Sequence, residues 1–225
     1  MEREGPWGRV VVLNGGSSSG KTTIGRQLQV SFRETWVLIG IDVLIWLLPM
    51  QMMKDPDGLL IQDGVVRRGT EFMRLYLAFQ QAVATLARSG VNVILDDVMH
   101  DGLVDRRRWE RAFVDVDTLW VGIHCDSGVV QTREKERGDR PRGLARNTAA
   151  SCHRDIDYDI EVDTSMMEVG AAVQHIVSGI GRRWPAETAP SSKELPVQPP
   201  ISALTKNGSI GRAPWEHDKP SDGPV

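Results

Sequence analysis

The eight consecutive residues from Gly15 to Thr22 carry the chemistry that is easiest to recognise in this chain. They read GGSSSGKT, which satisfies the pattern G-x-x-x-x-G-K-[ST], and they follow the apolar run 10–13 directly. Glycines in such a loop let backbone N–H groups turn inward around phosphate oxygens, and the helix that begins near Lys21 points its positive N-terminal end at them. Lys21 is expected to reach the β- and γ-phosphates of a nucleotide, and Thr22 to place its hydroxyl on Mg²⁺.

This loop predicts ATP and Mg²⁺ as cofactors. The alternative is a chance Gly/Ser turn, which the strand pattern before the loop and the helix pattern after it argue against. The residues expected to bind the nucleotide are Gly15, Gly16, Ser17, Ser18, Ser19, Gly20, Lys21, Thr22 and Thr23.

Two acidic residues, Asp96 and Asp97, close a second apolar run, Val93-Ile94-Leu95. An acid at the end of a strand can orient Mg²⁺ directly or through water in a P-loop enzyme. Side chains alternate along a strand, so only one of the two should face the nucleotide. We favour Asp97 as the metal residue beside Thr22, and the alternative is that either acid caps the next helix.

Asp42 follows another apolar run, Ile39-Gly40-Ile41, and is the candidate catalytic base. A hydroxyl acceptor must lose its proton as a phosphoryl group arrives, and a carboxylate within hydrogen-bond reach can orient the hydroxyl and accept that proton. The alternative is an N-cap for a helix that starts at Val43, and both roles are compatible.

Arginines are concentrated in the stretch 133–143, where P-loop kinases place a mobile lid. Guanidinium groups there can neutralise the charge that spreads over a transferring phosphoryl group. Arg137 and Arg140 adjoin flanking glycines and are the preferred catalytic candidates, while Arg133 is a candidate for binding the nucleotide. The alternative is a solvated charged face.

Strand and helix patterns alternate through the first 183 residues, which predicts an α/β domain with a five-stranded parallel sheet and helices on both faces. The expected strands are 9–14, 36–41, 91–96, 118–125 and 158–163. The expected helices are 21–32, 43–53, 71–89, 103–113, 129–137 and 166–182. In such a sheet the ligands lie at the carboxyl ends of the strands, where the residues named above fall.

Two segments depart from this alternation. The stretch 55–69 carries Asp57-Gly58 and Asp63-Gly64 around short apolar pairs, which predicts a small hairpin or ordered loop near an acceptor pocket. Residues 184–225 are rich in proline and have little apolar periodicity, so we expect a disordered tail beyond a phosphotransferase domain at 1–183.

The expected helix 43–53 is apolar on more than one face, because it carries Trp46 and several leucines and methionines. Part of this surface could line an apolar pocket, which would suit a hydrophobic acceptor better than a nucleotide or a sugar. The alternative is that the helix is simply buried.

Composition narrows the partners. The chain is 40% hydrophobic and 25% charged with a net charge of −3, so it has no basic footprint for nucleic acid. Neither an apolar stretch of membrane-spanning length nor a signal-peptide pattern is present, so we expect a cytoplasmic protein without a membrane partner. Cys125 and Cys152 have no metal-binding spacing and are expected to be free thiols. The five histidines show no ligand spacing either.

Taken in order, these segments resemble the chloramphenicol phosphotransferases, which are small P-loop kinases, and the resemblance covers about 10–182. The residues that carry it are Leu13 to Lys21, Gly40-Ile41-Asp42, Leu95 to Val98, Leu119 to Gly122, Arg137 to Arg140 and Tyr158 to Thr164. The resemblance implies the P-loop kinase fold and transfer of the γ-phosphate of ATP to the primary hydroxyl of chloramphenicol, which inactivates the antibiotic. It also implies that Asp42 occupies the position of the family's catalytic base. The segments 46–48 and 55–69 look divergent, and the tail has no counterpart in the family.

Two other readings remain open at this point. One is a kinase for a different hydroxyl acceptor, such as a nucleotide-sugar kinase of the toxin type, which would require a basic acceptor pocket. The other is a non-enzymatic, nucleotide-dependent interaction module whose proline-rich tail binds partners. The sequence assigns neither the oligomeric state nor a role for the tail.

Overall fold

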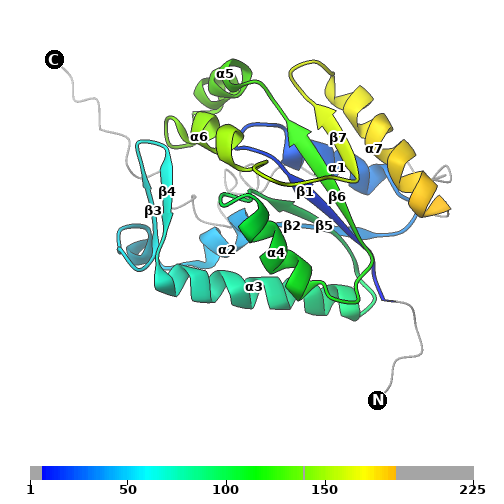
Figure 1. The fold of residues 1–225 in the computed structure, drawn as a ribbon, viewed down its shortest axis with the longest axis horizontal. Helices are drawn as coiled ribbons and strands as arrows, with labels where there is room; N and C mark the ends of the chain where they lie inside the picture. The colour runs from blue at the N-terminus through cyan, green and yellow to red at the C-terminus, as the bar shows by residue number, and fades with distance from the viewer. Residues whose placement is uncertain (1–6, 139, 186–225) are drawn as a thin grey trace, which may run out of the picture.

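A five-stranded parallel sheet forms the centre of the computed structural model, which describes residues 7–138 and 140–185 (Figure 1). The strand order is β2-β5-β1-β6-β7, and all neighbouring pairs are parallel. The bounds are β1 Val10–Asn14, β2 Trp36–Gly40, β5 Asn92–Asp97, β6 Thr118–His124 and β7 Ile160–Asp163. The five strands expected from the sequence are therefore confirmed, and so is the parallel sheet.

Helices cover both faces of the sheet, as the apolar patterns predict. Alternate residues of one strand point to opposite faces, so Val10 and Val12 pack on one core while Val11 and Leu13 pack on the other. Helices α2 (Ile41–Leu47), α3 (Thr70–Arg88) and α4 (Leu103–Ala112) supply the first core. Helices α1 (Lys21–Ser31) and α7 (Val169–Arg183) supply the second.

Helices α5 (Ser127–Arg137) and α6 (Leu144–Ser151) lie at the carboxyl ends of the strands and pack against each other (Figure 1). The sequence analysis expected α5 but not α6. Helix α6 is short and its residues LARNTAAS carry little apolar periodicity, so its signal is weak.

The helix expected at 43–53 is shorter in the structure. Helix α2 ends at Leu47, and a 3₁₀ turn, η1 (Met50–Met53), follows. Pro49 accounts for this break, because the residue before a proline is driven out of the helical region and Leu48 is extended with ψ 144°. The apolar residues of this segment are therefore divided between two environments. Ile45 lines the cleft described below, while Trp46 and Leu47 are exposed.

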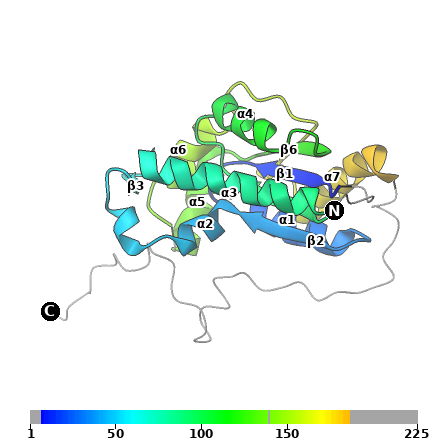
Figure 2. The same cartoon turned by 90° about the horizontal axis from the view of Figure 1, so that it is seen from below.

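The segment 55–69 contains the expected hairpin, formed by β3 (Leu59–Gln62) and β4 (Val65–Arg68) in antiparallel register. Asp63 and Gly64 have φ values of 51° and 74°, which is the left-handed pair that a tight hairpin turn requires. A Cβ added to Gly64 would lie 2.3 Å from the carbonyl carbon of Gly143, so the turn packs directly against the start of α6. Figure 2 shows this hairpin at one end of the molecule, away from the sheet.

Within 7–138 and 140–185, no helix is both long enough and apolar enough to cross a membrane. The expected tail, 184–225, lies outside the described residues from 186 onward. Its first residue, Trp184, is described and is buried in the second core, so the folded part extends past the expected boundary at 183.

Candidate active site

The phosphate-binding loop connects β1 to α1 at the carboxyl edge of the sheet. Gly20 has φ 95°, a left-handed conformation that favours glycine, and it directly precedes the first residue of α1. Lys21 is buried, and its Nζ donates to the carbonyl of Gly16 at 2.9 Å. Ser18 lines the adjoining cleft, and its buried hydroxyl has no hydrogen-bond partner among the described residues. The loop thus has the conformation that the sequence motif predicts.

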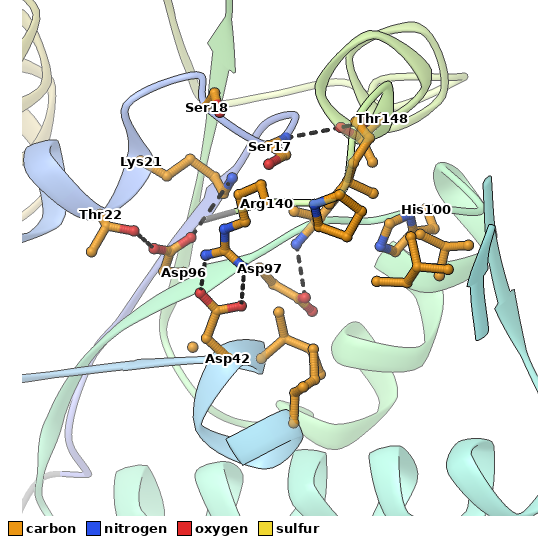
Figure 3. A pocket seen from close by; sticks show the side chains of 18 of the residues that line it. Ser17, Ser18, Lys21, Thr22, Asp42, Asp96, Asp97, His100, Arg140 and Thr148 are labelled. Carbon is orange, nitrogen blue, oxygen red and sulfur yellow. Dashed lines mark hydrogen bonds and ion pairs between the residues drawn. The ribbon is translucent and has the colours of Figure 1, made fainter. Parts of the chain in front are cut away.

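Asp96 is the strand-end acid that faces the loop. Its Oδ2 accepts a 2.5 Å hydrogen bond from the Thr22 hydroxyl, and its Oδ1 lies 3.8 Å from the Nζ of Lys21 (Figure 3). Burial raises the pKa of Asp96 above its ordinary value, although the charge of Lys21 and the hydrogen bond from Thr22 act in the opposite direction. A carboxylate and a hydroxyl at this separation are oxygen ligands of the kind that Mg²⁺ prefers.

Asp97, which the sequence analysis favoured as the metal residue, points to the other face of the sheet. Its Oδ2 accepts hydrogen bonds from the Tyr76 hydroxyl at 2.5 Å and the Trp109 indole at 2.6 Å, and its Oδ1 accepts from the backbone of Val98. Burial raises the pKa of Asp97 to about 6 despite these donors. The expectation that Asp97 is the metal residue is therefore corrected to Asp96. The two acids do point to opposite faces of the sheet, but Asp96 lies on the face that α1 covers, and Asp97 forms hydrogen bonds within the opposite core.

Asp42 lies at the mouth of the cleft, in the first turn of α2. Gly40 is the N-cap residue of this helix, so Asp42 does not cap it. Both carboxylate oxygens accept from the guanidinium of Arg140, at 3.3 and 2.5 Å (Figure 3). Desolvation acts to raise the pKa of Asp42, but the charge and hydrogen bonds of Arg140 outweigh it and hold the pKa below its ordinary value. Asp42 is consequently ionised and able to accept a proton.

The three candidate arginines separate into two groups. Arg137 and Arg140 line the same cleft as Lys21 and Asp42, as the sequence analysis expected. Arg133 does not line it. Its guanidinium instead donates to the carbonyl and hydroxyl of Thr164, at 2.8 and 3.2 Å, and that hydroxyl donates to the carbonyl of Ser19. Arg133 thus braces the phosphate-binding loop from behind.

The cleft continues from the phosphate-binding loop into an apolar arm. We use this name for the lining contributed by α2, α3, the hairpin and α6, namely Ile45, Leu59, Ile61, Val66, Phe72, Tyr76 and Leu144. Arg68 and His100 also line the cleft here. Arg68 is 9% exposed and its guanidinium binds Asp101 at 2.5 Å and Asp105 at 3.0 Å. Arg108 pairs with the same two carboxylates, so two arginines and two carboxylates balance within this cluster. Burial, followed by the charge of Arg68, lowers the pKa of His100 to about 4, so its imidazole is neutral.

Asn14, the last residue of β1, joins three segments around the loop. Its Oδ1 accepts from the backbone of Met99, and its Nδ2 donates to the carbonyl of Cys152 at 2.7 Å and to the Tyr158 hydroxyl at 2.5 Å. The Tyr158 hydroxyl lies 2.8 Å from the Nδ1 of His153. Because this hydroxyl accepts from Asn14, its own proton is available to a neutral His153.

These residues fit a nucleoside triphosphate and a divalent cation. The loop supplies backbone N–H groups and the unpartnered Ser18 hydroxyl, Lys21 supplies a buried cation, and Thr22 with Asp96 supplies two oxygen donors. Among the described residues, no group of three or more His, Cys, Asp or Glu side chains is placed to hold a metal ion by itself. Mg²⁺ typically needs only one or two protein ligands when nucleotide phosphates complete its shell.

Several contributors to the cleft carry no recognisable sequence signal. Thr148 and Arg68 belong to this group, because each acts through a tertiary contact with a residue far away in the chain: Ser17 for Thr148, and Asp101 with Asp105 for Arg68. The apolar pairs of the hairpin were the only indication that the segment 55–69 would border the acceptor side.

A parallel sheet of this order with a phosphate-binding loop after β1 and an acid at the end of β5 is a P-loop nucleotide-binding fold. The model of the chloramphenicol phosphotransferase-like proteins matches residues 8–180, and the chain belongs to that family. The resemblance noted in the sequence is thereby confirmed.

One relative is the Mycobacterium tuberculosis (strain H37Rv) protein named "Putative O-phosphotransferase Rv2636". It is 34% identical in an alignment of 179 residues that covers 73% of this chain and 78% of that protein. Two solved structures show the same fold at low identity. A gluconokinase from Sinorhizobium meliloti 1021 has a TM-score of 0.57 at 17% identity, covering 78% of this chain and 93% of its own. The Mycobacterium tuberculosis APS kinase CysC, in complex with AMPPNP and APS, has a TM-score of 0.53 at 14% identity, covering 78% and 99%.

Proposed function

We propose that this protein is an ATP- and Mg²⁺-dependent O-phosphotransferase that phosphorylates the primary hydroxyl of chloramphenicol or of a similar neutral aromatic antibiotic. The observation that carries the proposal is the position of the Asp42–Arg140 pair, which lies in one cleft with the phosphate-binding loop and the apolar arm. A hydroxyl presented by an acceptor in the apolar arm would meet Asp42 and the end of the nucleotide together.

On the nucleotide side, the loop and Lys21 would hold the phosphates, and Thr22 with Asp96 would hold Mg²⁺. The nucleotide, when bound, supplies the phosphoryl group, and the cation neutralises charge on its phosphates. This assignment replaces Asp97 with Asp96, because the carboxylate of Asp97 is occupied by Tyr76 and Trp109.

On the acceptor side, Asp42 would orient the hydroxyl and accept its proton as the oxygen attacks. Arg140 pairs with Asp42 and keeps it ionised, which is the form that can accept a proton. Arg140 and Arg137 would also stabilise the charge that spreads over the phosphoryl oxygens during transfer. The apolar arm would exclude water, which otherwise competes with the acceptor for the phosphoryl group.

The balance of charge in the apolar arm favours a neutral acceptor. A phosphate or carboxylate on the acceptor would need a cation, and Arg68 already binds Asp101 and Asp105. A neutral His100 adds no positive charge. An aromatic ring could instead pack against Phe72, Tyr76 and Leu59, which line this end of the cleft.

The proposal is tested by incubating the purified protein with ATP, Mg²⁺ and single acceptors, and by measuring ADP release together with the mass of the acceptor. Chloramphenicol represents the neutral aromatic class, and gluconate represents a smaller, anionic hydroxyl compound. We expect ADP release that depends on chloramphenicol and a drug carrying one added phosphoryl group. Phosphorylation of gluconate in preference to chloramphenicol would contradict the proposed acceptor class.

A further inference from the structure

Helix α6 is hydrogen-bonded to the phosphate-binding loop through Thr148. The backbone N–H of Ser17 donates to the Oγ1 of Thr148 at 2.9 Å, and Figure 3 shows this contact on the far side of the loop from Asp96. The Thr148 hydroxyl donates in turn to the carbonyl of Leu144, one turn earlier, at 2.7 Å. Thr148 is 1% exposed, so its side chain is enclosed between the helix and the loop.

Two further contacts hold α6 along the same loop. A Cβ added to Gly16 would lie 2.8 Å from the backbone nitrogen of Ala149, so the helix backbone approaches the loop as closely as a glycine permits. Asn14, immediately before the loop, donates to the carbonyl of Cys152 at the end of α6. The helix and the loop therefore form one packed unit, with Thr148 at its centre.

The opposite end of α6 is fixed to α5 by Glu134. This buried carboxylate accepts from the backbone of Gly143 at 2.8 Å and from that of Ala145 at 2.7 Å, which caps the start of α6. Arg140 lies in the connection between Glu134 and α6. Gly143, three residues after Arg140, is held by Glu134, so a shift of α6 along the phosphate-binding loop would also displace Arg140.

We infer that Thr148 is a positioning residue for phosphoryl transfer. Its hydroxyl fixes the position of α6, and with it that of Arg140, relative to the phosphate-binding loop. Thr148 acts through Arg140 and need not contact the nucleotide itself. The inference rests on the proposed function in one respect only, namely that Arg140 contacts the γ-phosphate of the bound nucleotide.

The test measures the affinity of the full chain for AMPPNP and for ADP with Mg²⁺, by calorimetry, in three variants. Thr148→Val keeps the shape of the side chain but removes the acceptor of Ser17. Thr148→Ser keeps the hydroxyl and should restore the wild-type values. Thr85→Val is the matched control, because the exposed Thr85 also donates one turn back, to Gln81, but has no contact with the loop.

We expect Thr148→Val to weaken AMPPNP binding by about tenfold, since the Ser17 N–H loses its acceptor and α6 loses its hydrogen bond to the loop. ADP, which has no γ-phosphate, should change little. In an Arg140→Ala background the same substitution should add almost nothing, because the group that it positions is absent. Equal weakening of both nucleotides, additive effects with Arg140→Ala, or unchanged AMPPNP affinity in Thr148→Val or in Arg140→Ala would overturn the inference.

Neither nucleotide measurement requires an acceptor. A wild-type protein that phosphorylates none of the acceptors offered would refute the proposed reaction, while the selectivity between AMPPNP and ADP would still support or overturn the role of Thr148. Thermal unfolding of each variant accompanies the titrations. If Thr148→Val does not fold, Thr148→Ala, which also removes the acceptor of Ser17, takes its place in the same titrations.

Discussion

His153 gives a prediction whose size follows from the structure. The ring lies 4.0 Å from that of His124 in a stacked arrangement, and its Nδ1 faces the Tyr158 hydroxyl at the edge of the Asn14 network. Burial, followed by the charge of His124, lowers the pKa of His153 from 6.5 to about 4. Protonation of His153 would also place an N–H opposite the Tyr158 hydroxyl, which already accepts from Asn14. Acid should therefore weaken the hydrogen bonds among Asn14, Tyr158 and His153. The perturbation is His153→Asn, which keeps a polar side chain and removes the titration.

The sign follows from linkage. A histidine whose folded pKa is depressed binds its proton more readily in the unfolded chain, so its contribution is fully present above pH 6.5 and is lost as the pH falls toward 4. At 1.36 kcal/mol per pKa unit the full loss is about 3 kcal/mol, and the part that falls between pH 7.5 and pH 5 is about 2 kcal/mol. The free energy of unfolding of the wild type should fall by that amount relative to His153→Asn over this interval.

Urea unfolding at four pH values between 5 and 7.5 measures this difference directly. His175→Asn is the control, because His175 is exposed on α7, and it should leave the pH dependence of the wild type unchanged. A difference between wild type and His153→Asn that stays constant with pH would refute the reasoning about burial. A difference that grows in favour of the wild type toward acid would show that the protonated ring is stabilised.

Three further predictions concern the site and the tail. Asp42→Asn should lose acceptor phosphorylation by a factor of at least about a hundred while its affinity for ATP, measured by calorimetry, stays near that of the wild type; unchanged turnover would leave Asp42 without a role as base. Asp96→Asn should lose the Mg²⁺-dependent part of ATP affinity, whereas Asp97→Asn should keep it and lower the midpoint of thermal unfolding, and the reverse pattern in titrations with and without Mg²⁺ would restore Asp97 as the metal residue. A chain ending at Pro185 should turn over at a near-normal rate, and loss of turnover in a folded truncated protein would place part of the site in 186–225.

Much of the fold could be predicted from the sequence because its signals are local. Runs such as Val10 to Leu13 are apolar without interruption, which is typical of parallel strands buried on both faces. Asp63-Gly64 specifies a tight turn through its own backbone preference. Helix α6 and the break at Pro49 are the exceptions: the first has little periodicity, and at the second the apolar residues on both sides of the proline suggest one continuous helix.

The site was predictable where a motif encodes it and not where tertiary contacts do. The loop, Lys21, Thr22 and Asp42 were found from residue types that follow strands. The choice between Asp96 and Asp97 depends on which face of β5 meets α1, and sequence alternation separates the two acids without saying which one faces the loop. Arg133 shares a charged run with Arg137 but does not line the cleft with it, because its guanidinium turns toward Thr164; a role for Arg133 in binding the nucleotide stays a prediction.

The central claim is that this cleft transfers a phosphoryl group from ATP to a hydroxyl held beside Asp42. The most direct measurement follows the label of [γ-³²P]ATP in a single turnover with chloramphenicol and Mg²⁺, using wild type and Asp42→Asn side by side at saturating nucleotide. We expect the wild type to transfer the label to the drug and Asp42→Asn to retain the label on bound ATP. Label that passes to water instead of the drug, or that reaches the drug equally fast in both proteins, would contradict it.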